Sequence, residues 1–146
     1  MVEIIDGKKK MIVSVDSYQY IRGKSTPKNF NYDANWLNVA VAYADNDVAD
    51  RVVDPCFMTT ELEEMVEALE AILDGKEESY ISDFLEPYFQ IAFVRDNVRV
   101  AVVVHFTYDT TDRPWKIWKA KQFLSYDEAV TFLNGLKRMC TMFPCR

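Results

Sequence analysis

Apolar residues alternate with polar or small ones along several stretches of the chain, which is the pattern of half-buried β-strands. One such stretch runs from Trp36 to Tyr43, and Trp36 lies on its second face. The first face, which we expect to be buried, holds every second residue: Leu37, Val39, Val41 and Tyr43. Residues 11–20 and 51–57 predict two further strands, and Pro55 places the latter at a sheet edge or a bulge.

The spacing of the apolar positions then changes to that of an amphipathic helix. The apolar stripe consists of Leu62, Met65, Val66, Leu69, Ile72 and Leu73. Thr60 and Glu63 have the spacing of a capping box at the helix start, and Gly75 suits the helix end. Four acidic residues recur on the opposite side, which must face water: Glu63, Glu67, Glu70 and Asp74.

Alternation returns in the second half of the chain, at residues 89–93 and 98–106. Asp96-Asn97 can form the two-residue loop of a hairpin between these strands, which makes them antiparallel. A loop at residues 109–114 leads to another strand at about residues 115–124. Ser125 and Glu128 form a second capping box before a second helix. The apolar face of that helix holds Tyr126, Ala129, Val130, Leu133, Leu136 and Cys140.

Three strands followed by a helix therefore occur twice. This order predicts an α+β fold, in which an antiparallel sheet of about six strands packs against two helices. A chain of 146 residues is the length of a single domain, residues 1–146, which can bury roughly two thirds of the surface that its unfolded chain exposes. The predicted core includes Trp36, Leu37, Val39, Leu69, Phe89, Ile91, Val102 and Leu133.

Acidic charge is concentrated in one part of the chain. Between Glu61 and Glu86 there are ten acidic residues and one basic residue, Lys76, whereas the whole chain has a formal net charge of -6. Such a patch repels phosphates, so it argues against a nucleic-acid partner and favours a cationic protein. The alternative is a solvated face that only keeps the protein in solution.

Residues that could carry catalysis are few. The single histidine, His105, lies in the middle of a predicted strand and has no fixed sequence relation to a cysteine. Asp45-Asn46-Asp47 lacks the glycine and the distal glutamate of a calcium loop, so it is predicted to be a solvated turn. Four scattered glycines cannot form a phosphate loop, and no set of His, Cys and carboxylate residues has metal-ligand spacing. We therefore expect no enzyme, no cofactor and no metal.

The cysteines and the N-terminal segment predict the cellular compartment. Cys56, Cys140 and Cys145 are odd in number and lack the spacing of a disulfide framework, which is typical of reduced thiols in the cytosol. The first ten residues lack the basic-then-apolar order of a signal peptide, and no apolar run approaches the roughly 20 residues that span a bilayer. We expect a soluble intracellular protein without a membrane partner.

Tryptophan and lysine alternate irregularly within residues 115–121, a mixture that also occurs in proteins that bind single-stranded nucleic acids. The residues are Trp115, Lys116, Trp118, Lys119 and Lys121. A period of two places the two tryptophans on opposite faces of a strand. We therefore prefer a strand with one core tryptophan, whose edge is covered by the lysine stems.

Three short motifs carry a resemblance to a known family. They are Tyr32-Asp33-Ala34-Asn35-Trp36-Leu37, then Thr59-Thr60-Glu61-Leu62 before the helix, then Leu85-Glu86-Pro87 with the strand Tyr88-Phe89-Gln90-Ile91. In this order and at these distances they resemble the WapI-like family of bacterial immunity proteins, over about residues 32–140. We interpret Asp33 and Asn35 as scaffold residues that bond backbone amides of a turn, and Trp36 as an anchor with a buried ring.

The resemblance implies a cytoplasmic antitoxin that binds the toxic C-terminal domain of a contact-dependent or secreted polymorphic toxin of the same strain. Such toxins are often nucleases, and neutralisation would be stoichiometric occlusion. From the charge pattern, the residues expected to bind the toxin are Glu63, Glu67, Glu70, Asp74, Glu77 and Glu78. Two alternatives stay open: a non-catalytic protein-binding regulator of another pathway, and a small ligand-binding domain with a concave polar pocket.

Overall fold

The computed structural model describes residues 1–20 and 33–146, and within them it has an α+β fold of two antiparallel four-stranded sheets and two helices. The first sheet has the order β1 (Val2–Asp6), β2 (Lys9–Tyr18), β3 (Trp36–Ala44) and β4 (Ala49–Met58). The second has the order β5 (Ser79–Ile81), β6 (Phe89–Asp96), β7 (Arg99–Asp109) and β8 (Lys116–Leu124). Each sheet is followed by one helix, α1 (Thr59–Leu73) or α2 (Tyr126–Met142).

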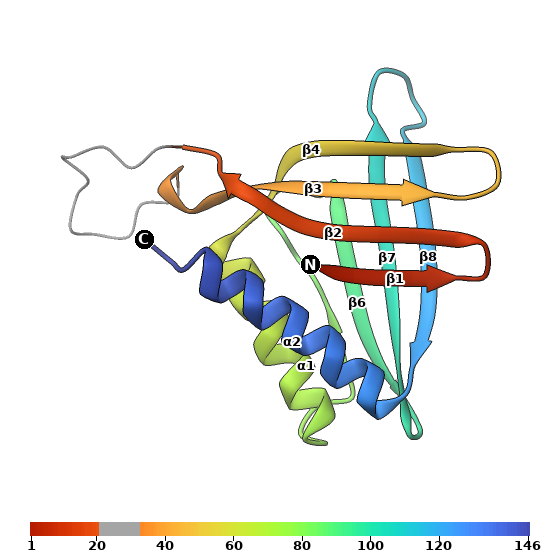
Figure 1. Ribbon diagram of the computed structural model, residues 1–146, viewed down its shortest axis with the longest axis vertical. Coiled ribbons are helices and arrows are strands. Elements are labelled where there is room, and N and C mark those ends of the chain that lie inside the picture. Colours follow the sequence, from red (N-terminus) through yellow and green to blue (C-terminus); the bar gives the residue numbers. More distant parts are fainter. Residues whose placement is uncertain (21–32) are drawn as a thin grey trace.

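The two sheets run crosswise to each other, and the two helices lie side by side against them (Figure 1). Helix α1 contacts β4, β5 and β6, whereas α2 contacts β1, β7 and β8. One buried apolar cluster includes residues of both sheets and both helices. Tyr43 of β3 shows how the sheets meet, because its ring lies 5.8 Å from that of Phe106 and 5.9 Å from that of Trp118 in the second sheet.

The α+β class and the order of strands before each helix are as predicted, but there are eight described strands in two sheets rather than about six in one. The sequence pattern missed β1 and β5. Only Val2 and Ile4 are buried in β1, and no residue of the three-residue β5 is fully buried. Strands this short give too few alternating positions to be recognised. The predicted core residues are buried except Trp36, which is half-buried.

The start of α1 differs from the prediction, and its end agrees with it. The helix begins at Thr59, directly after β4, with Met58 at the N-cap position. Glu61 takes the capping role, because its Oε2 atom accepts a hydrogen bond of 2.7 Å from the Met58 backbone N–H. The predicted capping box of Thr60 and Glu63 is therefore wrong: β4 leads into the helix without a loop, so the helix starts before Thr60. Gly75 follows the helix with a positive φ of 75°, as expected.

The second helix has the predicted capping box. The Ser125 hydroxyl accepts from the Glu128 N–H at 3.3 Å, and the Glu128 carboxylate accepts from the Ser125 N–H at 2.7 Å. Tyr126 was expected on the buried face but is 57% exposed. It is the first residue of α2, directly after the N-cap residue Ser125. The fully buried side chains of this helix are Ala129, Phe132, Leu133, Leu136 and Met139.

One turn and one edge refine the predicted strands. Asp96 pairs with Arg99, so the hairpin loop is Asn97-Val98 and lies one residue later than predicted. Asn97 supplies the positive φ of 55°. Strand β4 is an edge strand, and its pairing with β3 shifts register between Phe57 and Pro55, which confirms both parts of the Pro55 prediction.

Candidate partner-binding surface

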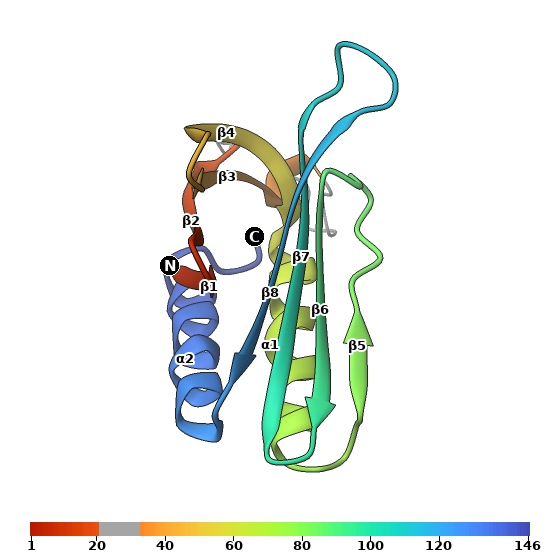
Figure 2. The same cartoon turned by 90° about the vertical axis from the view of Figure 1, so that its right-hand side faces the viewer.

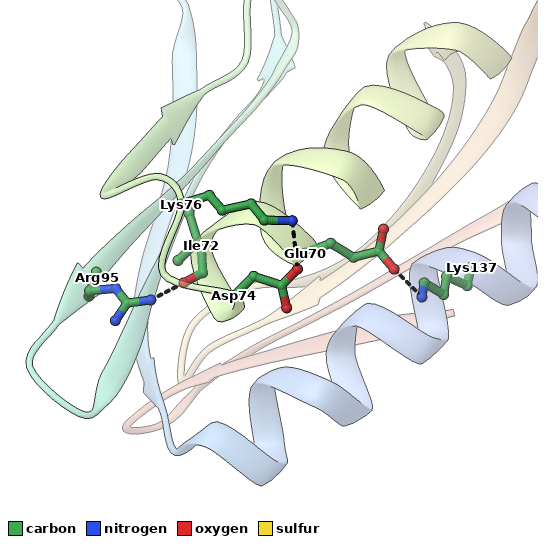
Figure 3. A network of polar contacts seen from close by, with 6 residues as sticks. All are labelled: Glu70, Ile72, Asp74, Lys76, Arg95 and Lys137. Carbon is green, nitrogen blue, oxygen red and sulfur yellow. Dashed lines mark hydrogen bonds and ion pairs between the residues drawn. The ribbon is translucent and has the colours of Figure 1, made fainter.

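Six acidic residues on and just after α1 form the surface that the sequence predicted for partner binding. We call Glu63, Glu67, Glu70, Asp74, Glu77 and Glu78 the acidic face of α1. Glu63 and Glu67 are exposed and form no ion pair with any described residue. The Glu70 carboxylate instead pairs with the Lys137 ammonium group of α2 (Figure 3). Asp74 pairs with Lys76 at 3.3 Å, in the turn after the helix.

Basic side chains moderate the charge at the C-terminal end of this face. The Arg95 guanidinium of β6 donates a hydrogen bond to the main-chain oxygen of Ile72, in the last turn of α1 (Figure 3). A cation at this position also interacts favourably with the helix dipole. Neither Arg95 nor Lys137 is near the acidic row in sequence, so the charge pattern gave no sign of them. Unpaired negative charge is therefore concentrated at Glu63 and Glu67, with Glu77 and Glu78 exposed beyond the helix.

Glu61 was counted with the acidic patch, but it is a buried scaffold residue with 7% exposure. Its carboxylate accepts from the Met58 N–H and, at 2.9 Å, from the Leu85 N–H. Burial raises the pKa of Glu61 above its ordinary value, although these two hydrogen bonds act in the opposite direction. Glu61 thus ties the start of α1 to the segment Leu85-Glu86-Pro87.

Asn35 ends a short 3-10 helix, η1 (Asp33–Asn35), and its side chain is fully buried. Its Oδ1 atom accepts from the Thr59 hydroxyl at 3.0 Å and from the Arg146 N–H at 2.8 Å, and its Nδ2 atom donates to the Arg146 main-chain oxygen. Asn35 therefore connects the start of β3, the start of α1 and the last residue of the chain. Trp36 was expected to bury its ring, and this is wrong because the side chain is only half-buried.

A pocket of about 300 Å³ brings two of the sequence motifs together. Trp36 comes from the start of β3, Asp54 from β4, and Glu86 and Tyr88 from the segment before β6. We call this site the aromatic–acidic pocket; its described lining residues are Gln19, Tyr20, Trp36, Asp54, Pro55, Glu86 and Tyr88. The motif resemblance pointed to Trp36, Glu86 and Tyr88, but nothing in the sequence pattern indicated Asp54.

The motifs are thus close together in the fold: Asn35 and Leu85 are hydrogen-bonded to residues at the start of α1, and Trp36 and Glu86 line the same pocket. A family model for the immunity protein WapI-like family matches residues 3–144 of the chain. The chain belongs to this family. The match is longer than the stretch over which the motifs carried the resemblance. A search of curated proteins gave no significant match.

Membership in the WapI-like family supports an immunity function and a protein toxin as the partner. The single histidine and the possible metal ligands were the other residues considered for catalysis. His105 is half-buried in β7, opposite Gln90 and Lys119, and burial and the Lys119 charge lower its pKa. Within residues 1–20 and 33–146, no three potential ligands lie close enough to hold a metal ion.

All three cysteines have free thiols, and they differ in burial. Cys56 is fully buried at the bulge of β4. Burial, with the nearby carboxylates of Asp54 and Glu86, raises the pKa of Cys56 to about 12. A thiol with this pKa remains protonated at neutral pH and is a poor nucleophile.

No described helix is both long and apolar enough to cross a membrane.

The strand with tryptophans and lysines is β8, at the edge of the second sheet. Trp118 is buried and Trp115 is 39% exposed, which confirms one core tryptophan. The lysines of this strand, Lys116, Lys119 and Lys121, are exposed. Trp115 is the last residue of the loop between β7 and β8, and this loop extends beyond the rest of the molecule (Figure 2).

The predicted solvated turn between β3 and β4 is also present. One carboxylate oxygen of Asp45 accepts from the backbone N–H groups of Asp47 and Val48, at 2.8 and 2.9 Å. These two hydrogen bonds lower the pKa of Asp45. The aspartate therefore stabilises its own turn.

Proposed function

We propose that this chain is a cytoplasmic antitoxin that binds the toxic domain of a contact-dependent or polymorphic toxin and blocks it by stoichiometric occlusion. The observation that carries the proposal is the match of the WapI-like immunity family to residues 3–144. Occlusion requires a stable complementary surface and no catalytic residues. The high pKa of the buried Cys56 thiol is compatible with a non-catalytic role.

The acidic face of α1 is the docking surface in this proposal, and the toxin is a nuclease. Nuclease domains present basic clefts to phosphates, so a fixed row of carboxylates competes for the same surface. A helix holds such a row rigidly. Glu63 and Glu67 are the two members on α1 that are exposed and not engaged by a described basic residue. Complementary charge of this kind raises the association rate more than the final affinity.

The test is charge reversal at these two residues. The substitutions Glu63→Lys and Glu67→Lys, made together, replace two negative charges with positive ones and leave the ion pair between Glu70 and Lys137 in place. The matched control is Asp47→Lys with Asp112→Lys, which changes the net charge equally at two exposed residues outside α1. Each protein is mixed with the toxin domain encoded beside its gene, and association is followed at several salt concentrations.

We expect the α1 variant to associate about tenfold more slowly than wild type and to show a weaker salt dependence. The control should stay within a factor of about two, because its charges lie away from the docking surface. An α1 variant that associates like the control would place the docking surface elsewhere. A wild-type protein that does not bind the neighbouring toxin domain at all would contradict the proposed function itself.

A further inference from the structure

The aromatic–acidic pocket combines two kinds of group that recognise the same chemistry. Its carboxylates come from Asp54 and Glu86, and its rings from Trp36, Tyr88 and Tyr20. Trp36, Glu86 and Tyr88 are half-buried, and Asp54 and Tyr20 are exposed, so all five can meet a ligand at the surface. Carboxylates attract cations, and the faces of Trp and Tyr rings attract cations as well.

No described residue supplies the cation that this pocket favours. Neither the Asp54 nor the Glu86 carboxylate forms a hydrogen bond or an ion pair with a described residue. A nearby guanidinium, that of Arg146, is already engaged by the main-chain oxygens of Ala34 and Tyr20 and lies 3.4 Å from the centre of the Tyr18 ring. Partial burial raises the pKa of Asp54 above its ordinary value, because it disfavours the charged carboxylate. A bound cation would stabilise that charge and lower the pKa again.

The carboxylates act on the same small region. Asp54, Pro55 and Glu86 all line the pocket, and both carboxylates raise the pKa of the thiol of the next residue along β4, the buried Cys56. A further ring lies next to the pocket: the ring centroids of Tyr88 and of Trp115, the last residue of the loop between β7 and β8, are 6.1 Å apart. Tryptophan, tyrosine and arginine are the residues enriched at interface hot spots.

We propose that the aromatic–acidic pocket accepts an arginine side chain of the protein partner, with the guanidinium held by Asp54 and Glu86 and stacked on the Trp36 and Tyr88 rings. Arginine fits better than lysine because its planar group stacks on aromatic faces and presents several fixed donors to carboxylates. The inference rests on the proposed function for the identity of the partner. It adds a second contact, separate from the acidic face of α1.

The first experiment uses the isolated protein. N-acetyl-arginine amide is added to wild type while NMR follows the Trp36 indole N–H, and N-acetyl-citrulline amide serves as the uncharged analogue. We expect saturable shifts with the arginine compound, much smaller shifts with citrulline, and loss of the arginine shifts in the Asp54→Asn, Glu86→Gln double variant. Equal shifts with both compounds, or no saturable shift, would overturn the proposal.

The second experiment uses the toxin domain encoded beside the gene. The double variant should bind it about tenfold more weakly, mainly through faster dissociation, because it removes a charge-assisted contact formed in the complex. The control, Asp47→Asn with Asp127→Asn, removes two exposed carboxylates elsewhere and should change the affinity less than about twofold. Denaturation curves of both variants establish that each is folded.

The outcomes separate the two proposals. Wild type and double variant that bind the toxin domain equally would sink the pocket assignment and leave the immunity function standing. A wild type that binds arginine at Trp36 but not the toxin domain would support the pocket chemistry and contradict the proposed function.

Discussion

Removing the Glu61 carboxylate should destabilise the protein more than removing any exposed acid of α1. In Glu61→Ala the N–H groups of Met58 and Leu85 lose their acceptor. A hydrogen bond to a charged group contributes about 1.5 to 3 kcal/mol, and an unsatisfied buried donor costs about 1 to 3 kcal/mol. Met58 is 4% exposed, so its N–H bears that cost, whereas Leu85 is 63% exposed and water can replace its acceptor. Relief from burying the carboxylate offsets part of the loss. We expect a net loss of about 2 to 4 kcal/mol.

Urea denaturation at neutral pH, followed by tryptophan fluorescence, measures this loss directly. Glu67→Ala is the control, because Glu67 is exposed on the same helix and should change the free energy of unfolding by less than about 0.5 kcal/mol. Glu61→Gln keeps one acceptor oxygen and should fall between the two. If Glu61→Ala and Glu67→Ala unfold at the same urea concentration, the two hydrogen bonds do not stabilise the start of α1 and the reasoning is refuted.

Three further outcomes are expected. Because burial raises the folded-state pKa of Glu61 above its ordinary 4.5, the stability of wild type relative to Glu61→Gln should be greatest below pH 4.5 and should decline as pH rises through the folded-state value; a pH-independent difference would contradict this. Gly135→Ala should lose about 1 to 3 kcal/mol in urea denaturation instead of gaining helix stability, since the new Cβ would lie 2.6 Å from the Met1 main-chain oxygen. His105→Gln should still protect cells that express the toxin, and a folded variant that fails to protect would indicate a catalytic role.

Local patterns in the sequence predicted the helices and strands in which a periodic apolar pattern extends over many residues or a capping motif is present. The stripe from Leu62 to Ile72 found α1, and Ser125 with Glu128 found the start of α2. Strand β3 was predicted because apolar positions alternate from Trp36 to Tyr43, and Pro55 marked the edge strand. Each of these signals lies within a few residues of the feature that it predicts. The assignment of residues 1–146 to a single domain stays a prediction.

Features that depend on contacts between distant segments could not be predicted. Whether eight strands form one sheet or two depends on which edges pair, and no local pattern records that choice. Counting charges along the sequence treated Glu61 like the other acidic residues. In the structure β4 continues directly into α1, and the Glu61 side chain near this junction is buried. The pair between Glu70 and Lys137 requires α1 and α2 to lie side by side, which is known only from the fold.

The candidate sites show the same division. The acidic face of α1 could be predicted because its acidic residues recur along the sequence at the spacing of one side of a helix. The ion pairs that some of them form with basic residues could not be predicted. The aromatic–acidic pocket draws Trp36, Asp54 and Glu86 from three separate segments, so spacing along the chain does not reveal it. Family resemblance pointed to Trp36 and Glu86 as motif residues without indicating that they share a pocket.

Titration of the toxin's activity with the purified protein tests the central claim most directly. The toxin domain encoded beside the gene is held at a concentration well above its dissociation constant, and its remaining activity is measured as the protein is added. Stoichiometric occlusion predicts a linear fall that reaches zero at equimolar protein and does not change with incubation time. Full activity at an excess of protein, or progressive inactivation by a small fraction of an equivalent, would contradict the account.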